Sequence, residues 1–139
     1  MIKTTIYIEK YDWTVYAYFS VSCYYPFDIV ARMKAIGVPR KHLSRAYRML
    51  ASCELDSGLC ISNPDTRSSV LVTSHSTSAA EFLDSLTHEI SHLAQHISSA
   101  CNISKNSEDF CYIAGDVAKA LHPYCRKLLC DCQKGRRLS

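Results

Sequence analysis

A helical repeat of apolar residues marks the stretch from residue 78 to residue 100. The positions that recur at intervals of three and four are Leu83, Leu86, Ile90, Leu93 and Ile97. At about 100° per residue these side chains form one apolar stripe, which leaves the opposite side of the helix open. The residues before the stripe, Ser78-Ala79-Ala80-Glu81, have the form of a capping box. The pattern therefore predicts a helix from about Ser78 to Ala100.

The N-terminal part of the chain alternates polar and apolar residues, as strands do. Thr4 to Ile8 and the run from Trp13 to Val21 predict a hairpin. The second of these strands carries Tyr16 and Tyr18 on its other face. We expect that face to be either a half-exposed aromatic surface or a surface for a partner.

A second hairpin is predicted directly before the long helix. Its strands are Leu59 to Ser62 and Ser69 to Thr73, and Asn63-Pro64-Asp65 supplies the turn. The segment from Val70 to Thr73 has two interpretations that the sequence leaves open. It is either an edge strand, to which an extended peptide could add, or a strand inside the core.

Further helices are predicted on both sides of the second hairpin. One runs from Asp28 to Ile36 and is closed by Gly37, and another spans residues 43–50. Ser107 is a good N-cap for a helix that Pro123 ends or kinks. The expected fold class is α+β, with a small antiparallel or mixed sheet packed on the long helix and on the helix that follows it.

The length of 139 residues fits one domain. We expect it to span residues 1–132 and residues 133–139 to form a disordered basic tail. The formal charge of +3 is mild and lies partly in that tail, so no nucleic-acid partner is expected, and the basic residues 40–48 are interpreted as a solvated helix face. The N-terminus has no continuous apolar run, which predicts a cytoplasmic protein without a membrane span. The oligomeric state is not indicated.

The eight cysteines are numerous for a cytoplasmic chain. An even number permits disulfides, but there is no visible export signal, and several cysteines have apolar neighbours. We therefore expect free thiols, which behave as small hydrophobic side chains.

The long predicted helix contains a His-Glu-x-x-His motif at residues 88–92. His88 and His92 are four residues apart and lie on one helical face, so both imidazoles can bind one ion. Glu89 is placed to accept a proton from water at that ion. The motif predicts a zinc hydrolase with Zn²⁺ as its cofactor. His96 continues the spacing but lies about 6 Å further along the axis, too far to bind the same ion.

With this motif the sequence resembles the zincin metallopeptidases, and among them the gluzincin type. Residues 57–115 are similar to small, mostly uncharacterised predicted peptidases of bacteria and their phages. The matching segments are Ser57-Gly58-Leu59, Arg67-Ser68-Ser69-Val70, Glu81-Phe82, the metal motif and Glu108-Asp109-Phe110-Cys111-Tyr112-Ile113-Ala114-Gly115. The resemblance implies a minimal zincin fold, a glutamate ligand on the helix after the motif, and a shallow site for a small or flexible substrate.

Two acids begin that following helix, and we assign the third zinc ligand to Glu108 rather than Asp109. Glu108 lies about 160° from Phe110 around the helix and hence opposite its apolar stripe. Asp109 lies nearer the flank of the stripe. On the same side as Glu108, Gly115 would let this helix approach the metal helix closely.

The predicted reaction is hydrolysis of peptide bonds in a peptide or protein substrate. Zinc lowers the pKa of a bound water to about 7, and Glu89 would act as the general base. Tyr112 is the first candidate for stabilising the developing oxyanion, with His122 and Tyr124 as others. The alternative is a catalytically inactive zincin-fold protein that binds or regulates a partner, with zinc structural or absent.

Overall fold

The computed structural model describes residues 1–23, 25–53, 55 and 58–132; the predicted tail, residues 133–139, lies outside these ranges. Its centre is a four-stranded sheet of β1 (Ile2–Ile8), β2 (Trp13–Val21), β3 (Gly58–Asn63) and β4 (Ser68–Ser74). The strand order is β1-β2-β4-β3, with β4 parallel to β2 and antiparallel to β3. Both predicted hairpins are confirmed, and the short 3-10 helix η1 (Glu9–Tyr11) joins β1 to β2.

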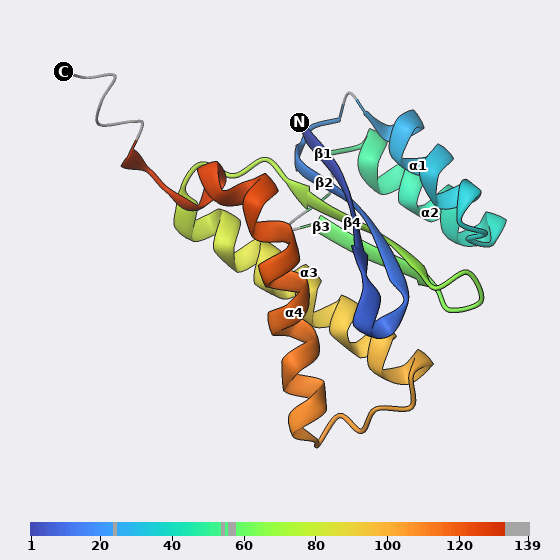
Figure 1. The fold of residues 1–139 in the computed structure, drawn as a ribbon. Coiled ribbons are helices and arrows are strands. Elements are labelled where there is room, and N and C mark those ends of the chain that lie inside the picture. The colour runs from blue at the N-terminus through green and yellow to red at the C-terminus, as the bar shows by residue number, and fades with distance from the viewer. Residues whose placement is uncertain (24, 54, 56–57, 133–139) are drawn as a thin grey trace.

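Helices cover both faces of this sheet. The described helices are α1 (Pro26–Ala35), α2 (Arg40–Ala51), α3 (Ala79–Ala100), α4 (Glu108–Cys125) and the short 3-10 helix η2 (Arg126–Leu129). Figure 1 shows α1 and α2 on one side of the sheet and α3 and α4 on the other. The α+β class with a mixed sheet packed on the motif helix is confirmed. Within the described ranges, no helix has both the length and the apolar character that crossing a bilayer requires.

The larger core lies between the sheet and the pair α3 and α4. Alternate residues of β2 point into it and are fully buried, namely Trp13, Val15, Ala17 and Phe19. The Phe19 ring packs edge to face against the ring of Phe82 on α3, with 5.8 Å between the ring centres. Phe82, rather than Leu83, begins the buried stripe of α3, and Leu83 is 53% exposed. The prediction for Leu83 was wrong because Phe82, four residues before Leu86, faces the sheet and turns Leu83 outward.

The smaller core lies on the opposite face, under α1 and α2. Tyr18 is buried there, and the Arg32 guanidinium lies 4.3 Å from the centre of the Tyr16 ring. The aromatic face of β2 is thus covered by the chain's own helices. β4 is buried along most of its length between β2 and β3. Of the two interpretations of Val70 to Thr73, the core strand is therefore correct, and β3 forms the edge of the sheet.

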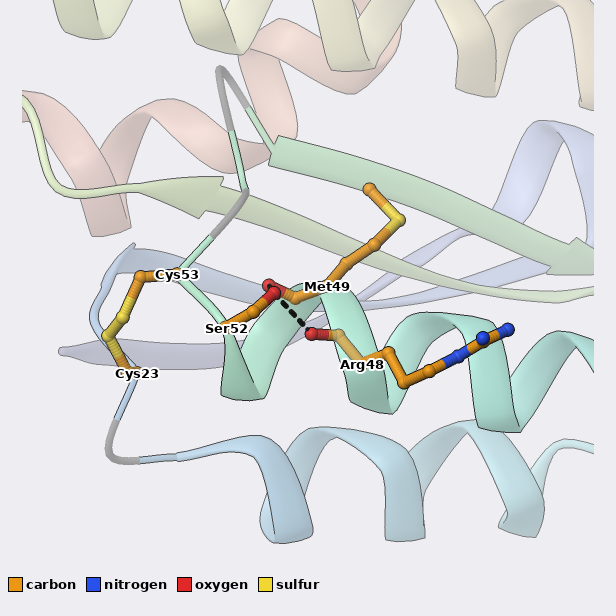
Figure 2. The surroundings of a disulfide bond; sticks show 5 residues. All are labelled: Cys23, Arg48, Met49, Ser52 and Cys53. Atoms are coloured by element: carbon orange, nitrogen blue, oxygen red, sulfur yellow. Dashed lines mark hydrogen bonds between the residues drawn. A yellow bond between two sulfur atoms is a disulfide. The ribbon is translucent and has the colours of Figure 1, made fainter.

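Disulfide bonds correct the expectation of free thiols. Cys23, which follows β2, is bonded to Cys53, which follows α2 (Figure 2). A second bond joins Cys130 to Cys132. The free cysteines of the described chain are Cys60, Cys101, Cys111 and Cys125. Spacing along the sequence could not reveal the first pair, because it forms only where the end of β2 meets the end of α2.

Candidate metal centre and cavity

Hydrogen bonds at the start of α3 hold the motif helix in place. Ser78 Oγ accepts a bond from the Glu81 backbone N–H at 3.1 Å. The Glu81 carboxylate accepts one from the Thr77 backbone N–H at 2.8 Å. The predicted capping box is confirmed, although the carboxylate bonds one residue earlier than the usual pattern. Since His88 follows more than two turns later, the motif lies in the rigid interior of the helix.

His88 and His92 converge on one point. Their Nε2 atoms are 3.2 Å apart, and the ring planes make an angle of 79°. In a tetrahedral zinc site with Zn–N bonds of about 2.0–2.1 Å, two ligand nitrogens lie about 3.3 Å apart. The pair therefore has the separation that two zinc ligands require.

The two histidines open into a cavity of about 420 Å³ beside the edge strand β3. Three elements line it, with His88, Glu89 and His92 from α3, residues 58–61 from β3, and His42, Arg45, Ala46 and Met49 from α2. Consecutive residues of a strand point to opposite faces, so a cavity lined by four of them in a row follows the strand's edge. The cavity is therefore a groove along β3. Because α2 and α3 lie on opposite faces of the sheet, they form its two side walls (Figure 1).

Gly58 lets β3 begin beside the cavity. Its φ is +156°, and a Cβ at this position would overlap the carbonyl oxygen of Val72 on β4. A larger residue would push β3 away from β4 and move the floor of the groove.

Glu89 lies at the base of the cavity and is only 2% exposed. It is close to Cys60 of β3. Burial raises the pKa of the Cys60 thiol, and the negative charge of Glu89 raises that pKa further. Both effects favour the protonated thiol form of Cys60.

His96, one turn beyond His92, has different neighbours. Its Nδ1 is 2.7 Å from Ser62 Oγ, which is 2.6 Å from Ser69 Oγ. Trp13 Nε1 donates to the same Ser69 oxygen at 2.8 Å. Burial lowers the pKa of His96, which favours its neutral form. His96 lines a separate cavity, so its position is consistent with the expectation that it is not a ligand.

The residues expected from α4 lie elsewhere. Tyr112 is exposed, and Lys10 Nζ lies 5.5 Å from the centre of its ring. Lys10 belongs to the connection between β1 and β2, and β1 is the edge strand opposite β3. Glu108 is exposed in the first turn of α4. Among the residues that line the cavity in the described structure, none comes from α4.

The structure therefore brings together His88, Glu89 and His92 but adds neither Glu108 nor Tyr112. No described cluster of three or more His, Cys, Asp or Glu side chains is arranged to hold a metal ion. The argument from Gly115 was wrong, since a Cβ built there meets no atom within 4 Å and the glycine faces open space. The roles of Glu108 and Tyr112 stay predictions that nothing in the geometry supports.

His42 and Arg45 are cavity residues that the sequence did not identify. They are three residues apart on α2, so they share a helical face. The available signal was the excess of basic residues on this helix, which was interpreted as a solvated face. Helical spacing predicts that face, but only the packing of α2 against the sheet turns it toward the motif.

Comparison with known proteins gives no further assignment. No protein-family model matches the chain, and no similar curated protein or solved structure was found. The function is therefore inferred from the cavity and its residues.

Proposed function

We propose that the chain is a zinc-dependent metallopeptidase that hydrolyses peptide bonds in the groove between α2, β3 and α3. The observation that carries this proposal is the separation of 3.2 Å between the Nε2 atoms of His88 and His92, at the wall of a cavity. Two ring nitrogens at that distance require a proton or a cation between them, because two facing lone pairs repel each other. A zinc ion fits the observed separation.

Each motif residue has a distinct task in this proposal. When bound, zinc supplies a Lewis acid that polarises the scissile carbonyl and makes water acidic. His88 and His92 would hold the ion through Nε2 on the rigid interior turns of α3. Glu89, one residue from His88 and facing the same cavity, accepts the proton of the attacking water and passes it to the leaving amine.

The edge strand supports a peptide as the substrate. β3 has a strand neighbour, β4, on one side only in the described sheet, and the groove follows its other side. An extended peptide can add to such an edge through main-chain hydrogen bonds. This placement would bring a backbone carbonyl alongside the two histidines and fix its orientation for attack.

A second candidate function is a binding or regulatory protein with the same cavity, in which zinc is structural or absent. One observation favours it, namely that within the described residues no third His, Cys, Asp or Glu completes the cluster. Catalytic zinc sites usually have three protein ligands and leave one position open. The identity of the third ligand therefore separates the two candidates.

Metal analysis of purified variants tests the site. We expect about one zinc per chain in the wild type and none in His88→Ala. His122→Ala, a histidine change outside the cavity, is the matched control and should retain the zinc. Loss of zinc in Glu108→Gln would identify the third ligand, whereas unchanged content would exclude it. If neither the wild type nor His122→Ala bound zinc, the metallopeptidase proposal would be wrong.

A peptide-library digest tests the reaction. The Glu89→Gln variant preserves side-chain shape but cannot accept a proton, so we expect it to keep zinc and lose hydrolysis by roughly 10²-fold to 10⁴-fold. Equal turnover by both proteins would contradict the role of Glu89. Zinc binding without cleavage of any peptide by the wild type would favour the binding protein.

A further inference from the structure

The wall of the groove formed by α2 is strongly basic. This helix contains four Lys and Arg residues and no Asp or Glu over residues 40–51. His42 and Arg45 of the helix line the cavity and are exposed. The α2 wall thus presents positive charge to whatever lies along β3.

These cations are not neutralised by neighbours within the described chain. The ion pairs of the described residues join Lys3, Lys10 and Arg67 to aspartates, and none involves α2. Among the described residues, Glu89 is the one acidic side chain that lines the cavity, and it is buried at the base of the cavity on α3. Arg45 is therefore available to pair with an anionic group of a ligand, and such a charge-assisted hydrogen bond is stronger than a neutral one.

The geometry of the edge strand decides which groups of a peptide meet this wall. Side chains of an extended peptide alternate between the two faces of the sheet it joins. One set would point toward α3 and its histidines, and the other toward α2. In the same way Cys60 of β3 packs against the core on the α3 side, whereas Leu59 and Ile61 pack against the core under α2.

We propose that Arg45, assisted by His42, selects substrates that carry a carboxylate on the side of the groove facing α2. This proposal rests on the proposed function, because it assumes that the substrate is a peptide lying along β3. The carboxylate can come from an Asp or Glu side chain or from the C-terminus of the peptide. The apolar parts of the lining, Met49, Leu59 and Ile61, fit a polypeptide better than a phosphodiester chain.

Binding to the Glu89→Gln variant tests the proposal without hydrolysis. The probes are three unlabelled decapeptides, all acetylated at the N-terminus, and isothermal titration calorimetry measures their affinities. One contains glutamate and is amidated, one replaces each glutamate by glutamine and is amidated, and one is the glutamine peptide with a free C-terminus. At about 0.15 M salt we expect at least one carboxylate peptide to bind about tenfold more tightly than the neutral peptide. The probe that gains affinity identifies the source of the carboxylate.

Matched arginine variants separate the groove from general attraction by a basic helix. Arg45→Ala in the Glu89→Gln protein should reduce the preference for the carboxylate to less than about threefold. Arg48 lies on the same helix and does not line this cavity, so Arg48→Ala should leave the preference unchanged. Equal effects of the two variants, equal affinity for all three peptides, or no binding of any peptide would overturn the proposal. Tighter binding of a single-stranded oligonucleotide competitor would also overturn it.

Failure of the carboxylate-site proposal can be distinguished from failure of the proposed peptidase function. Binding that depends on Arg45, with no cleavage of the same peptide by the wild type, would support the carboxylate-site proposal and rule out the peptidase proposal. Cleavage of neutral and acidic peptides at equal rates by the wild type would support the peptidase proposal and rule out the carboxylate-site proposal.

Discussion

The two helices that form the walls of the groove, α2 and α3, are built in opposite ways. α3 buries residues along its whole length, from Phe82 to Ser98, and packs against β3, β4 and α4. α2 buries only Ala46 and Leu50, and its four Lys and Arg residues are all exposed. One wall is anchored by a continuous core, and the other rests on the sheet through few contacts.

The difference between these walls matches the tasks proposed for them. Two metal ligands and a general base need fixed positions, because an error of about 1 Å in geometry costs a large part of the rate. Recognition of a substrate carboxylate tolerates movement, and the flexible side chain of Arg45 can adapt to it. Since α2 has a small core, the Cys23–Cys53 disulfide at its end contributes more to its placement (Figure 2). In the same view the Met49 side chain extends from α2 toward the strands.

The largest stability effect is expected from the cross-link on the α2 side. The Cys23→Ser/Cys53→Ser double variant releases a bond between residues 30 positions apart. The chain-entropy model predicts that the free energy of unfolding falls by about 3.5 kcal/mol. Urea denaturation measures this difference. The control is Cys130→Ser/Cys132→Ser, whose bond spans two positions and should contribute about 1 kcal/mol.

This double variant also sharpens the contrast between the walls. The His88 and His92 pair lies on α3 and has its own core, so the folded variant should retain zinc. Loss of zinc together with the disulfide would show that the placement of α2 also holds the metal site, and the two walls would not be independent.

A slightly smaller effect is expected from the core of α3. Leu93 is fully buried, and Leu93→Ala should lower the free energy of unfolding by about 3 kcal/mol through lost burial and a residual cavity. Leu83→Ala on the same helix removes an exposed side chain and should change it by less than about 0.5 kcal/mol. Thermal or urea unfolding compares the two. Similar losses would mean that Leu83 packs in solution and that the stripe is wider than the structure indicates.

The smallest effect concerns the pH dependence of stability. The pKa of His96 is lowered from its ordinary value of 6.5, mainly by burial and then by His92 and Lys105. The unfolded chain therefore binds a proton at His96 more readily than the folded chain. The sign follows directly: stability from this group is complete above pH 6.5 and declines as pH falls below 6.5 toward the folded pKa.

Replacement of His96 tests the direction of this pH dependence. His96→Gln should flatten the fall in the free energy of unfolding below pH 6.5, measured by urea denaturation at several pH values. An unchanged slope would show that His96 does not contribute. A steeper slope in the variant would mean that the pKa is raised rather than lowered.

Features that depend on neighbours along the chain were predicted well. The limits of α3 and the N-caps Ser78 and Ser107 follow from side chains that bond to backbone groups three residues away. Both hairpins follow from the period of two and the turn residues between the strands. The His88 and His92 pair is local in the same sense, because residues four apart on a helix meet in any fold that keeps the helix.

Features that depend on residues far apart could not be predicted from local patterns. The phase argument placed Glu108 opposite the apolar stripe of its own helix, but it carried no information on how α4 crosses α3 or where the outer face of α4 points. The structure sets Tyr112 beside Lys10 instead. The Cys23–Cys53 bond was not predicted for the same reason, since no local pattern indicates that these two chain segments meet.

The amino-acid sequence by itself determined the α+β class, the motif helix and the paired histidines with Glu89 between them, because periodicity, capping and helical spacing act within a few residues. Only the tertiary structure decided that β4 lies between β2 and β3, which makes β3 the edge of the sheet. It alone set Arg45 across that edge from His88, in one cavity. These arrangements come from burying both faces of one sheet at once, and that is a property of the whole chain rather than of any segment.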